Sequence, residues 1–263
     1  MRGVGCCLDS DYYDLVERIG YDYIEFPGAV ISRMPEEDFR KVVLKVKEGR
    51  IGCYGFVSLL PPEVAVVGPN FNPETVRRFA KAILARGAAL GISVVGVGSR
   101  YARQLPEGYD MALAWKQAEE FFRIFCEEAT VYPGISVMYE ALLRWSCQFG
   151  HSLKEGADFV RRMNLPNLSL ICDIGNIDVE KEDVSDIAYS ADVIKHVHIA
   201  ETVGFERRYL TVEKADYYKA MLGAIWESGY KGNLSIEASA GDIESGCRDT
   251  LSILRGILAE LGV

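Results

Sequence analysis

A chain of 263 residues is long enough to bury a substantial hydrophobic core within one large domain. Hydrophobic residues make up 49% of the chain and charged residues 25%, which is the balance of an ordinary globular protein. The net charge of -9, without any run of like charges, argues against nucleic acid and against an anionic membrane surface as partners.

The first residues lead directly into a predicted strand, and no stretch approaches about 18 consecutive apolar residues. We therefore expect a cytoplasmic protein with neither a signal peptide nor a membrane-spanning segment. The seven cysteines are an odd number, scattered without framework or C-x-x-C spacing. We expect them to be reduced thiols that pack as small core residues.

Strand and helix patterns alternate from one end of the chain to the other. Eight apolar runs have the length and composition of strands: residues 3–7, 21–26, 51–59, 92–97, 135–140, 168–173, 194–201 and 233–237. Amphipathic segments with capping residues predict the helices that separate them: residues 9–20, 35–49, 72–90, 109–129, 152–163, 182–190, 212–228 and 243–261. Irregular loops are expected at residues 61–72 and 98–108.

Eight strands alternating with eight helices, at repeats of roughly thirty residues, predict a (β/α)8 TIM barrel. An open doubly wound sheet is the competing fold. It is disfavoured by the count of eight and by the lack of a glycine-rich turn after the first strand. No linker or low-complexity segment is present, so we expect a single domain over residues 1–263.

Two of the three histidines, His196 and His198, lie two residues apart in the seventh predicted strand and therefore point to the same face. Three other predicted strands end on a carboxylate: Glu140, Asp173 and Glu237. A carboxylate is costly to bury unless it is paired or bound to a metal. In a barrel, these strand ends meet at the mouth where active sites lie.

The four residues Glu140, Asp173, His198 and Glu237 therefore predict one site for a divalent cation such as Mn²⁺, Mg²⁺, Co²⁺ or Zn²⁺. His196 would lie one pleat deeper, and we expect it to be packed and hydrogen-bonded inside the barrel.

In strand order, the chain resembles the sugar isomerase and epimerase family that has a xylose isomerase-like TIM barrel. The sequences that carry this resemblance are Tyr139-Glu140, Asp173, Val197-His198-Ile199-Ala200-Glu201 and Ile236-Glu237. The family includes tagatose and psicose epimerases, hydroxypyruvate isomerases and inosose dehydratases. The resemblance implies that the four residues are metal ligands and that Glu140 and Glu237 also form an acid–base pair.

Such residues suit proton transfer next to a carbonyl. A cation stabilises the enediolate that forms when a C–H proton leaves. One carboxylate removes this proton, and a second carboxylate on the other face can return it with inversion. We therefore expect a metal-dependent isomerase or epimerase that acts on a small-molecule sugar, sugar phosphate or polyol.

Further residues are candidates for contact with the substrate. The resemblance implies this role for Arg207, in the loop after the seventh strand, for Glu201, and for Asn176. Glu25 lies at the end of the second predicted strand, where relatives often begin the substrate wall. Arg100 and Arg103 lie in a loop expected over the same mouth, where either could bind a phosphate or carboxylate. Trp145 is expected to pack against helices or the rim.

The chain also departs from the family pattern. Asp173-Ile-Gly-Asn176 has an asparagine where the family frequently has a histidine, and Arg207-Arg208-Tyr-Leu lacks the Pro-Gly that often follows the arginine. Both departures weaken the assignment to a ketohexose epimerase and leave the metal site unaffected.

Three alternative functions stay open at this point. The same metal and base suit a lyase of the inosose dehydratase kind, which would expel a hydroxyl group beta to the carbonyl. A non-catalytic sugar-binding barrel is a second alternative, although it would not need an acid–base pair. Phosphodiester hydrolysis is disfavoured because AP endonucleases need several histidines. Barrels of this type often form homo-oligomers, but the sequence identifies no interface.

Overall fold

The structure, a computed structural model, describes residues 3–263. Eight parallel strands form a closed barrel in chain order, so the predicted (β/α)8 TIM barrel is confirmed. The strands are β1 (Val4–Cys7), β2 (Tyr23–Pro27), β3 (Gly52–Val57), β4 (Val94–Val97), β5 (Ser136–Glu140), β6 (Leu168–Asp173), β7 (Ile194–Ile199) and β10 (Asn233–Ile236). The last strand, β10, pairs with both β7 and β1 and so closes the barrel.

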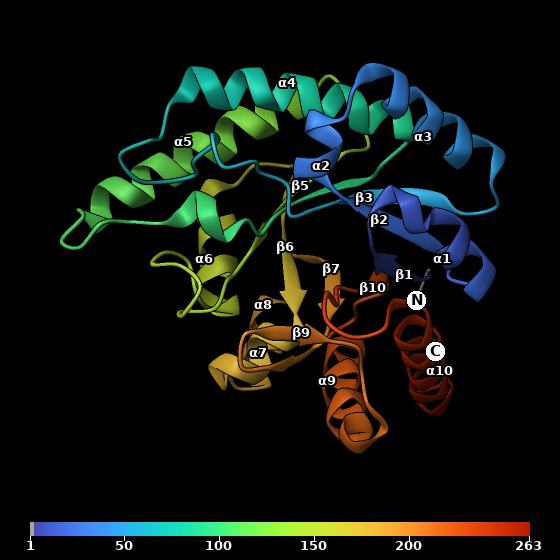
Figure 1. Ribbon diagram of the computed structural model, residues 1–263. Coiled ribbons are helices and arrows are strands. Elements are labelled where there is room, and N and C mark those ends of the chain that lie inside the picture. The colour runs from blue at the N-terminus through green and yellow to red at the C-terminus, as the bar shows by residue number, and fades with distance from the viewer. Residues whose placement is uncertain (1–2) are drawn as a thin grey trace.

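The helices surround the strands (Figure 1). They are α1 (Tyr13–Ile19), α2 (Gly28–Arg33), α3 (Glu36–Glu48), α4 (Pro73–Leu90), α5 (Met111–Ala129), α6 (Leu153–Met163), α7 (Ile174–Glu180), α8 (Ser185–Ser190), α9 (Ala215–Glu227) and α10 (Ile243–Glu260). Several of the long helices begin where the sequence places a capping side chain. Asn72, Asp110, Ser152 and Asp242 each accept a hydrogen bond from a backbone N–H of the first turn.

The structure differs from the predicted elements at two loops that matter for the barrel mouth. A short helix, α7, follows β6 directly because the Asp173 carboxylate accepts a hydrogen bond from the Asn176 backbone N–H and caps the helix. The predicted seventh strand divides, because β7 ends at Ile199 and a separate antiparallel hairpin follows. Its strands are β8 (Glu201–Val203) and β9 (Glu206–Arg208).

The core has two layers because side chains alternate along each strand. Val95, Val97, Val137, Tyr139 and Leu170 belong to the large core shared by strands and helices. Their neighbours on the same strands form a separate small cluster of Val94, Met138 and Ile171 with Tyr54. This second cluster fills the barrel interior, so the side chains of the strand ends rest on a packed floor.

All seven cysteines are buried and free, in agreement with the expected reduced thiols. Within residues 3–263, none of the helices is both long and apolar enough to cross a bilayer.

Candidate metal centre and active site

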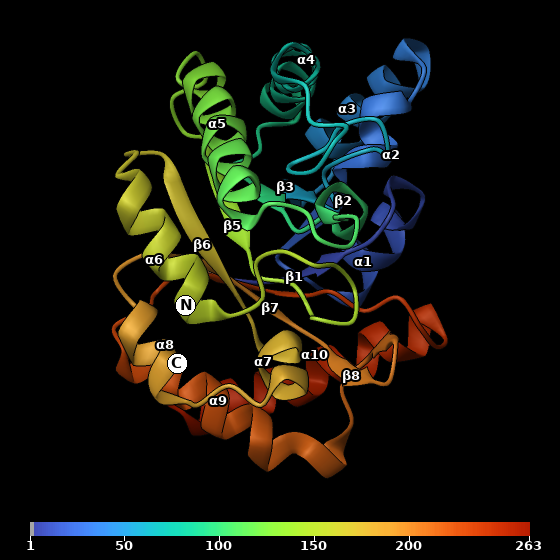
Figure 2. The ribbon, with the colours of Figure 1, turned by 90° about the vertical axis from the view of Figure 1, so that its left-hand side faces the viewer.

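A cavity of about 530 Å³ lies at the carboxyl ends of the barrel strands. Its lining includes Glu140 and Asp173, which are the last residues of β5 and β6, and Glu237, which directly follows β10. The loop between β5 and α6 lies near α7 in front of the barrel (Figure 2). This is the end of the barrel where the sequence predicts the active site.

The four predicted ligands converge at the bottom of this cavity. Glu140, Asp173, His198 and Glu237 each offer one ligand atom, and these atoms all lie within 4.8 Å of one another. The His198 Nδ1 atom is 3.1 Å from Glu140 Oε1 and 3.5 Å from Glu237 Oε2. Three carboxylates and one imidazole at these distances match the donors that divalent cations take in proteins.

A glycine at the end of β4 makes room for this cluster. A Cβ atom at Gly98 would lie 1.7 Å from Glu140 Oε2, which is an impossible contact. Any other residue at this position would therefore displace the Glu140 carboxylate. The sequence alone did not single out Gly98, because glycine is required there only to make room for a side chain on the neighbouring strand.

Arg207, in β9, reaches back into the cluster. Its Nη2 atom lies 2.7 Å from Asp173 Oδ2 and 3.0 Å from Glu237 Oε2, and its Nη1 donates to Asn176 Oδ1 at 3.1 Å. Its Nε also donates to the backbone oxygen of Glu237 at 2.9 Å. Arg207 and Asn176, two of the candidates for contact with the substrate, thus lie together in the cavity lining.

The charges of these groups suit a divalent cation. The three ionised carboxylates and the one guanidinium leave two negative charges when His198 is neutral. A cation with two positive charges would balance them in a region where unpaired buried charge is costly. The residues therefore fit a bound divalent ion, with Glu140, Asp173, His198 and Glu237 as its ligands.

The environments of Glu140 and Glu237 push their pKa values in opposite directions. Burial, with the nearby Glu237 charge, raises the pKa of Glu140 to about 7. Burial acts the same way on Glu237, but Arg207 and His198 outweigh it and lower the pKa of Glu237. Divergent pKa values in a close pair are typical of an acid and a base with separate roles.

A buried network lies beneath the cluster, inside the barrel. The carboxylate of Glu25 accepts hydrogen bonds from His196 Nε2 at 2.7 Å and from the Ser235 hydroxyl, and Ser235 is also bonded to the Tyr23 hydroxyl at 2.8 Å. Burial alone would raise the pKa of Glu25, but His196 and His198 lower it well below its usual range. Glu25 is therefore a fully buried anion below the site and does not form the substrate wall that the sequence suggested.

The same network faces the back of the His198 ring. Glu25 Oε2 lies 3.7 Å from His198 Nε2, on the side opposite the carboxylate cluster. A carboxylate behind a ligating imidazole favours the proton on that nitrogen and leaves the other nitrogen free for the metal. The two atoms are beyond hydrogen-bond distance, so Glu25 is placed to act on the tautomer and orientation of His198 through its charge.

A second group of possible ligands overlaps this network: Cys7, Glu25 and His198. It suits a metal less well than the first group. Burial, with the Glu25 charge, raises the pKa of the Cys7 thiol well above its usual range, so the thiol stays protonated and is a weak ligand. In addition, the Glu25 carboxylate already accepts hydrogen bonds from His196 and Ser235.

Two further predicted contacts lie elsewhere. The Arg103 side chain is completely buried, donates to the Val97 backbone oxygen and lies over the Tyr139 ring, 4.8 Å from its centroid. The Glu201 carboxylate accepts hydrogen bonds from Thr211 and Tyr218 at 2.8 Å, away from the cavity lining. Both residues therefore support the loops that frame the mouth. Arg100, in contrast, lines the cavity.

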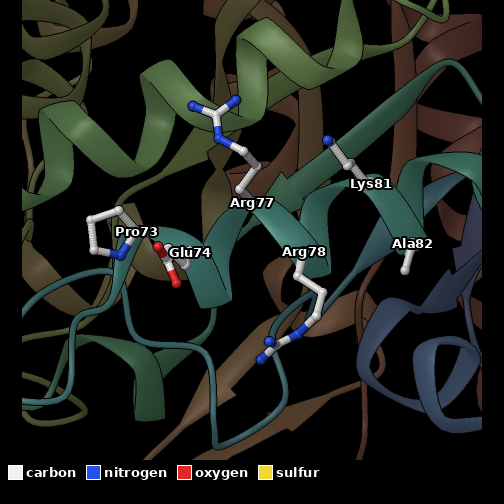
Figure 3. Close-up of a pocket in the computed structure, with 6 residues that line it drawn as sticks. All are labelled: Pro73, Glu74, Arg77, Arg78, Lys81 and Ala82. Atoms are coloured by element: carbon white, nitrogen blue, oxygen red, sulfur yellow. The ribbon is translucent and has the colours of Figure 1, made fainter.

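A second hollow follows the outer surface of α4 (Figure 3). Its cations include Arg77, Arg78 and Lys81, and Figure 3 shows Arg77 and Arg78 pointing away from each other. Arg77 is already paired with Glu127 and Glu128. This open surface lacks the buried, converging polar groups of the barrel mouth, so the mouth is the candidate active site.

The fold and the mouth together define a closed parallel barrel whose strand ends bring three carboxylates and one imidazole into a single cluster. Residues 13–257 match the family described as xylose isomerase-like TIM barrel, and the chain belongs to this family. No curated protein sequence matches the chain at a significant level.

Solved structures with the same fold include several sugar epimerases. The 3-keto-D-glucoside 4-epimerase of E. coli is 16% identical, with a TM-score of 0.78 over 97% of this chain and 100% of that one. A D-psicose 3-epimerase with D-tagatose, from Clostridium cellulolyticum H10, is 17% identical, with a TM-score of 0.79 over 98% and 99%. An L-ribulose 3-epimerase is 17% identical, with a TM-score of 0.82 over 99% and 96%. At these identities the similarity establishes the fold.

The first testable prediction concerns metal binding. Since the four ligands come from separate strands, Mn²⁺ should stabilise only the folded barrel, by about 2.7 kcal/mol at 100 times its Kd. For a chain of this length, that corresponds to a rise in Tm of roughly 5–10 °C. The substitution His198→Ala should remove most of this rise. The control His151→Ala lies outside the cluster and should keep it; the reverse pattern would contradict the site.

The second prediction concerns the orientation of His198. Glu25→Gln should weaken Mn²⁺ binding by about tenfold to a hundredfold, as measured by titration calorimetry, because the imidazole loses the carboxylate behind it. Tyr23→Phe is the matched control, since it removes a hydroxyl from the far end of the same network. Equal Mn²⁺ affinity in folded Glu25→Gln and wild-type protein would show that Glu25 does not orient His198.

The third prediction concerns pH and stability when EDTA keeps the metal away. A carboxyl with a raised pKa binds its proton more tightly in the folded state, so its contribution to stability falls as pH rises from 4.5 to about 7. Glu140→Gln removes this loss. The Tm of Glu140→Gln relative to wild type should therefore increase between pH 4.5 and pH 8. A difference in Tm that is constant with pH would show that the pKa of Glu140 is not raised.

Proposed function

We propose that the protein is a divalent-metal-dependent sugar isomerase or epimerase, working on a small-molecule sugar in the cytoplasm as one domain. The observation that carries this proposal is the placement of Glu140 and Glu237 in a single cluster from β5 and from the end of β10. These two strands are separated by β6 and β7 in the barrel, so the two carboxylates approach the cavity from different sides.

Each residue of the site has a role in this proposal. A divalent cation, when bound, polarises the substrate carbonyl and stabilises the charge that develops when a neighbouring C–H proton leaves. Glu237, with its lowered pKa, is ionised and suited to removing that proton, and Glu140, with its raised pKa, is suited to holding and returning one. The roles exchange in the reverse reaction.

The remaining polar groups of the floor bind and orient the sugar. Arg207 offers guanidinium N–H groups and Asn176 offers an amide beside the acid–base pair, and both suit sugar hydroxyl and carbonyl oxygens. The similar structures whose names state an activity on sugars, including L-ribulose 3-epimerase, support a sugar as substrate.

The alternatives are less well supported. A three-metal hydrolase needs several histidines, and the cluster contains only one. A non-catalytic sugar-binding barrel would not require the opposed pKa shifts of Glu140 and Glu237. A lyase uses the same metal and base, so the experiment below has to separate it from an epimerase.

The fourth prediction tests the acid–base pair. Glu140→Gln and Glu237→Gln each keep an oxygen for the metal and lose the base, so turnover should fall by roughly a hundredfold or more while metal binding persists. Deuterium wash-in from D₂O, followed by NMR on a panel of keto sugars, measures the proton transfer directly. In an epimerase, each variant should exchange the proton of one epimer only.

A dehydratase or an aldose–ketose isomerase would depend unequally on the two carboxylates. Loss of water from the sugar, seen in the same spectra, would replace the epimerase proposal with the lyase. Full activity in both Gln variants would contradict the proton-transfer mechanism altogether.

A further inference from the structure

The exposed aromatic side chains of the protein gather at the mouth of the cavity. Four aromatic residues in the described part of the chain are exposed: Tyr101, Trp145, Tyr189 and Phe205. Three of these, Tyr101, Trp145 and Phe205, line the cavity, whereas Tyr189 lies outside its lining. Clustered exposed apolar surface beside a cavity is typical of a binding surface. We call Tyr101, Trp145 and Phe205 the aromatic rim.

The rim is assembled from three separate loops. Trp145 lies between β5 and α6, Phe205 lies at the turn of the β8–β9 hairpin, and Tyr101 belongs to the short 3₁₀ segment after β4. The Trp145 and Phe205 rings are 4.6 Å apart and nearly perpendicular. Phe205 is 77% exposed and Trp145 39% exposed, so both rings keep most or part of their surface open for contact.

Hydrogen bonds fix these loops in place without any ligand. Gln104 donates to the Ser146 backbone oxygen at 2.7 Å, and the Arg144 backbone N–H donates to Glu180 at 2.7 Å, which ties the Trp145 loop to its neighbours on both sides. The hairpin that carries Phe205 is held by the Arg207 contacts in the floor. The rim is therefore preorganised, which lowers the entropic cost of binding.

The cavity consequently has two chemically different ends. Its floor offers carboxylates, a guanidinium and an amide, which suit the hydroxyl and carbonyl groups of a reacting sugar. Its upper wall offers aromatic faces together with Leu142 and Leu143. The faces of aromatic rings are negative and attract weakly positive C–H groups, such as those on the face of a sugar ring.

We propose that the natural substrate is a sugar that carries a second sugar ring, and that the aromatic rim binds this second ring while the floor binds the reacting unit. This inference rests on the proposed function for the identity of the reacting unit. A volume of about 530 Å³ is within the usual range for sites that enclose a ligand of this size. Arg100, whose guanidinium lies over the Tyr101 ring at 4.7 Å, has further N–H groups for the outer hydroxyls.

The test compares a ketose that carries a second ring with one that lacks it. D-Fructose and isomaltulose, which is fructose with a glucosyl group on O6, are titrated into the full-length Mn²⁺-loaded protein by calorimetry. Isomaltulose should bind about tenfold more tightly, which is the effect of one good ring contact. The double variant Trp145→Ala/Phe205→Ala should lose this preference and keep the fructose Kd. Val212→Ala, an exposed apolar residue outside the cavity lining, is the control.

Several outcomes would overturn the proposal. The first is equal affinity of the wild type for the two ketoses, and the absence of measurable binding of either counts as this outcome. The second is an isomaltulose preference that survives in the double variant. Sedimentation of the same samples covers a further case: if the wild type is a dimer that the double variant converts to a monomer, the rim is a contact between copies. Phe205→Tyr, which keeps the ring, should retain the isomaltulose preference.

This experiment is independent of the proposed chemistry. If deuterium wash-in fails across the whole panel of keto sugars but the rim-dependent preference persists, the proposed function is wrong and the second-ring site stands. If both ketoses exchange equally well and bind equally well, the function stands and the second-ring site is wrong.

Discussion

The site depends on how several carboxylates are buried together at the end of one barrel. Glu140, Asp173 and Glu237 lie within 4.8 Å of one another through their ligand atoms, and carboxylates so close repel one another strongly in a poorly solvated interior. Arg207 compensates this repulsion in part, and the two negative charges that remain when His198 is neutral suit a divalent cation. Because the negative charge has to be compensated, the Arg207 guanidinium, from a separate hairpin, lies in the floor of the cavity. For the same reason, a proton on Glu140 is favoured when no cation is bound.

A second layer of polar groups, in which a buried charge is also compensated, lies below the site inside the barrel. Glu25 is ionised there because His196 and Ser235 bond to it, although it is completely buried. Polar groups in such a place are tolerated only when they are paired, so the layer behaves as one connected unit. Glu25 Oε2 lies 3.7 Å from His198 Nε2, so this layer lies directly beneath the candidate metal site.

The fold and the four clustered residues were predictable from the sequence, because both follow from the regular geometry of strands. Eight alternating apolar runs identify the barrel, and a charged residue at the end of a run must lie at its mouth, as Glu140 and Asp173 do. No comparable rule predicts the direction in which a loop side chain points. Arg103 and Glu201 occur in loops, and their burial and partners are set by neighbours distant in sequence, such as Tyr139 and Tyr218.

Glu25 shows a different limit. It was expected at the end of a strand, but it is the middle residue of β2, next to a shift in register between β2 and β3, and its side chain meets His196 inside the barrel. The β8–β9 hairpin was missed because its strands are very short, at three residues each. Gly98 and the aromatic rim were missed because their significance arises only from residues on other strands and loops.

The β8–β9 hairpin has one consequence beyond its contacts. Phe205 at its turn faces the opening, and Arg207, two residues later, touches Asp173 and Glu237 in the floor. Only one residue, Glu206, separates these two positions, so the hairpin links the opening of the cavity to its floor. A change in the shape of its turn would therefore alter the position of the guanidinium in the floor as well as the shape of the entrance.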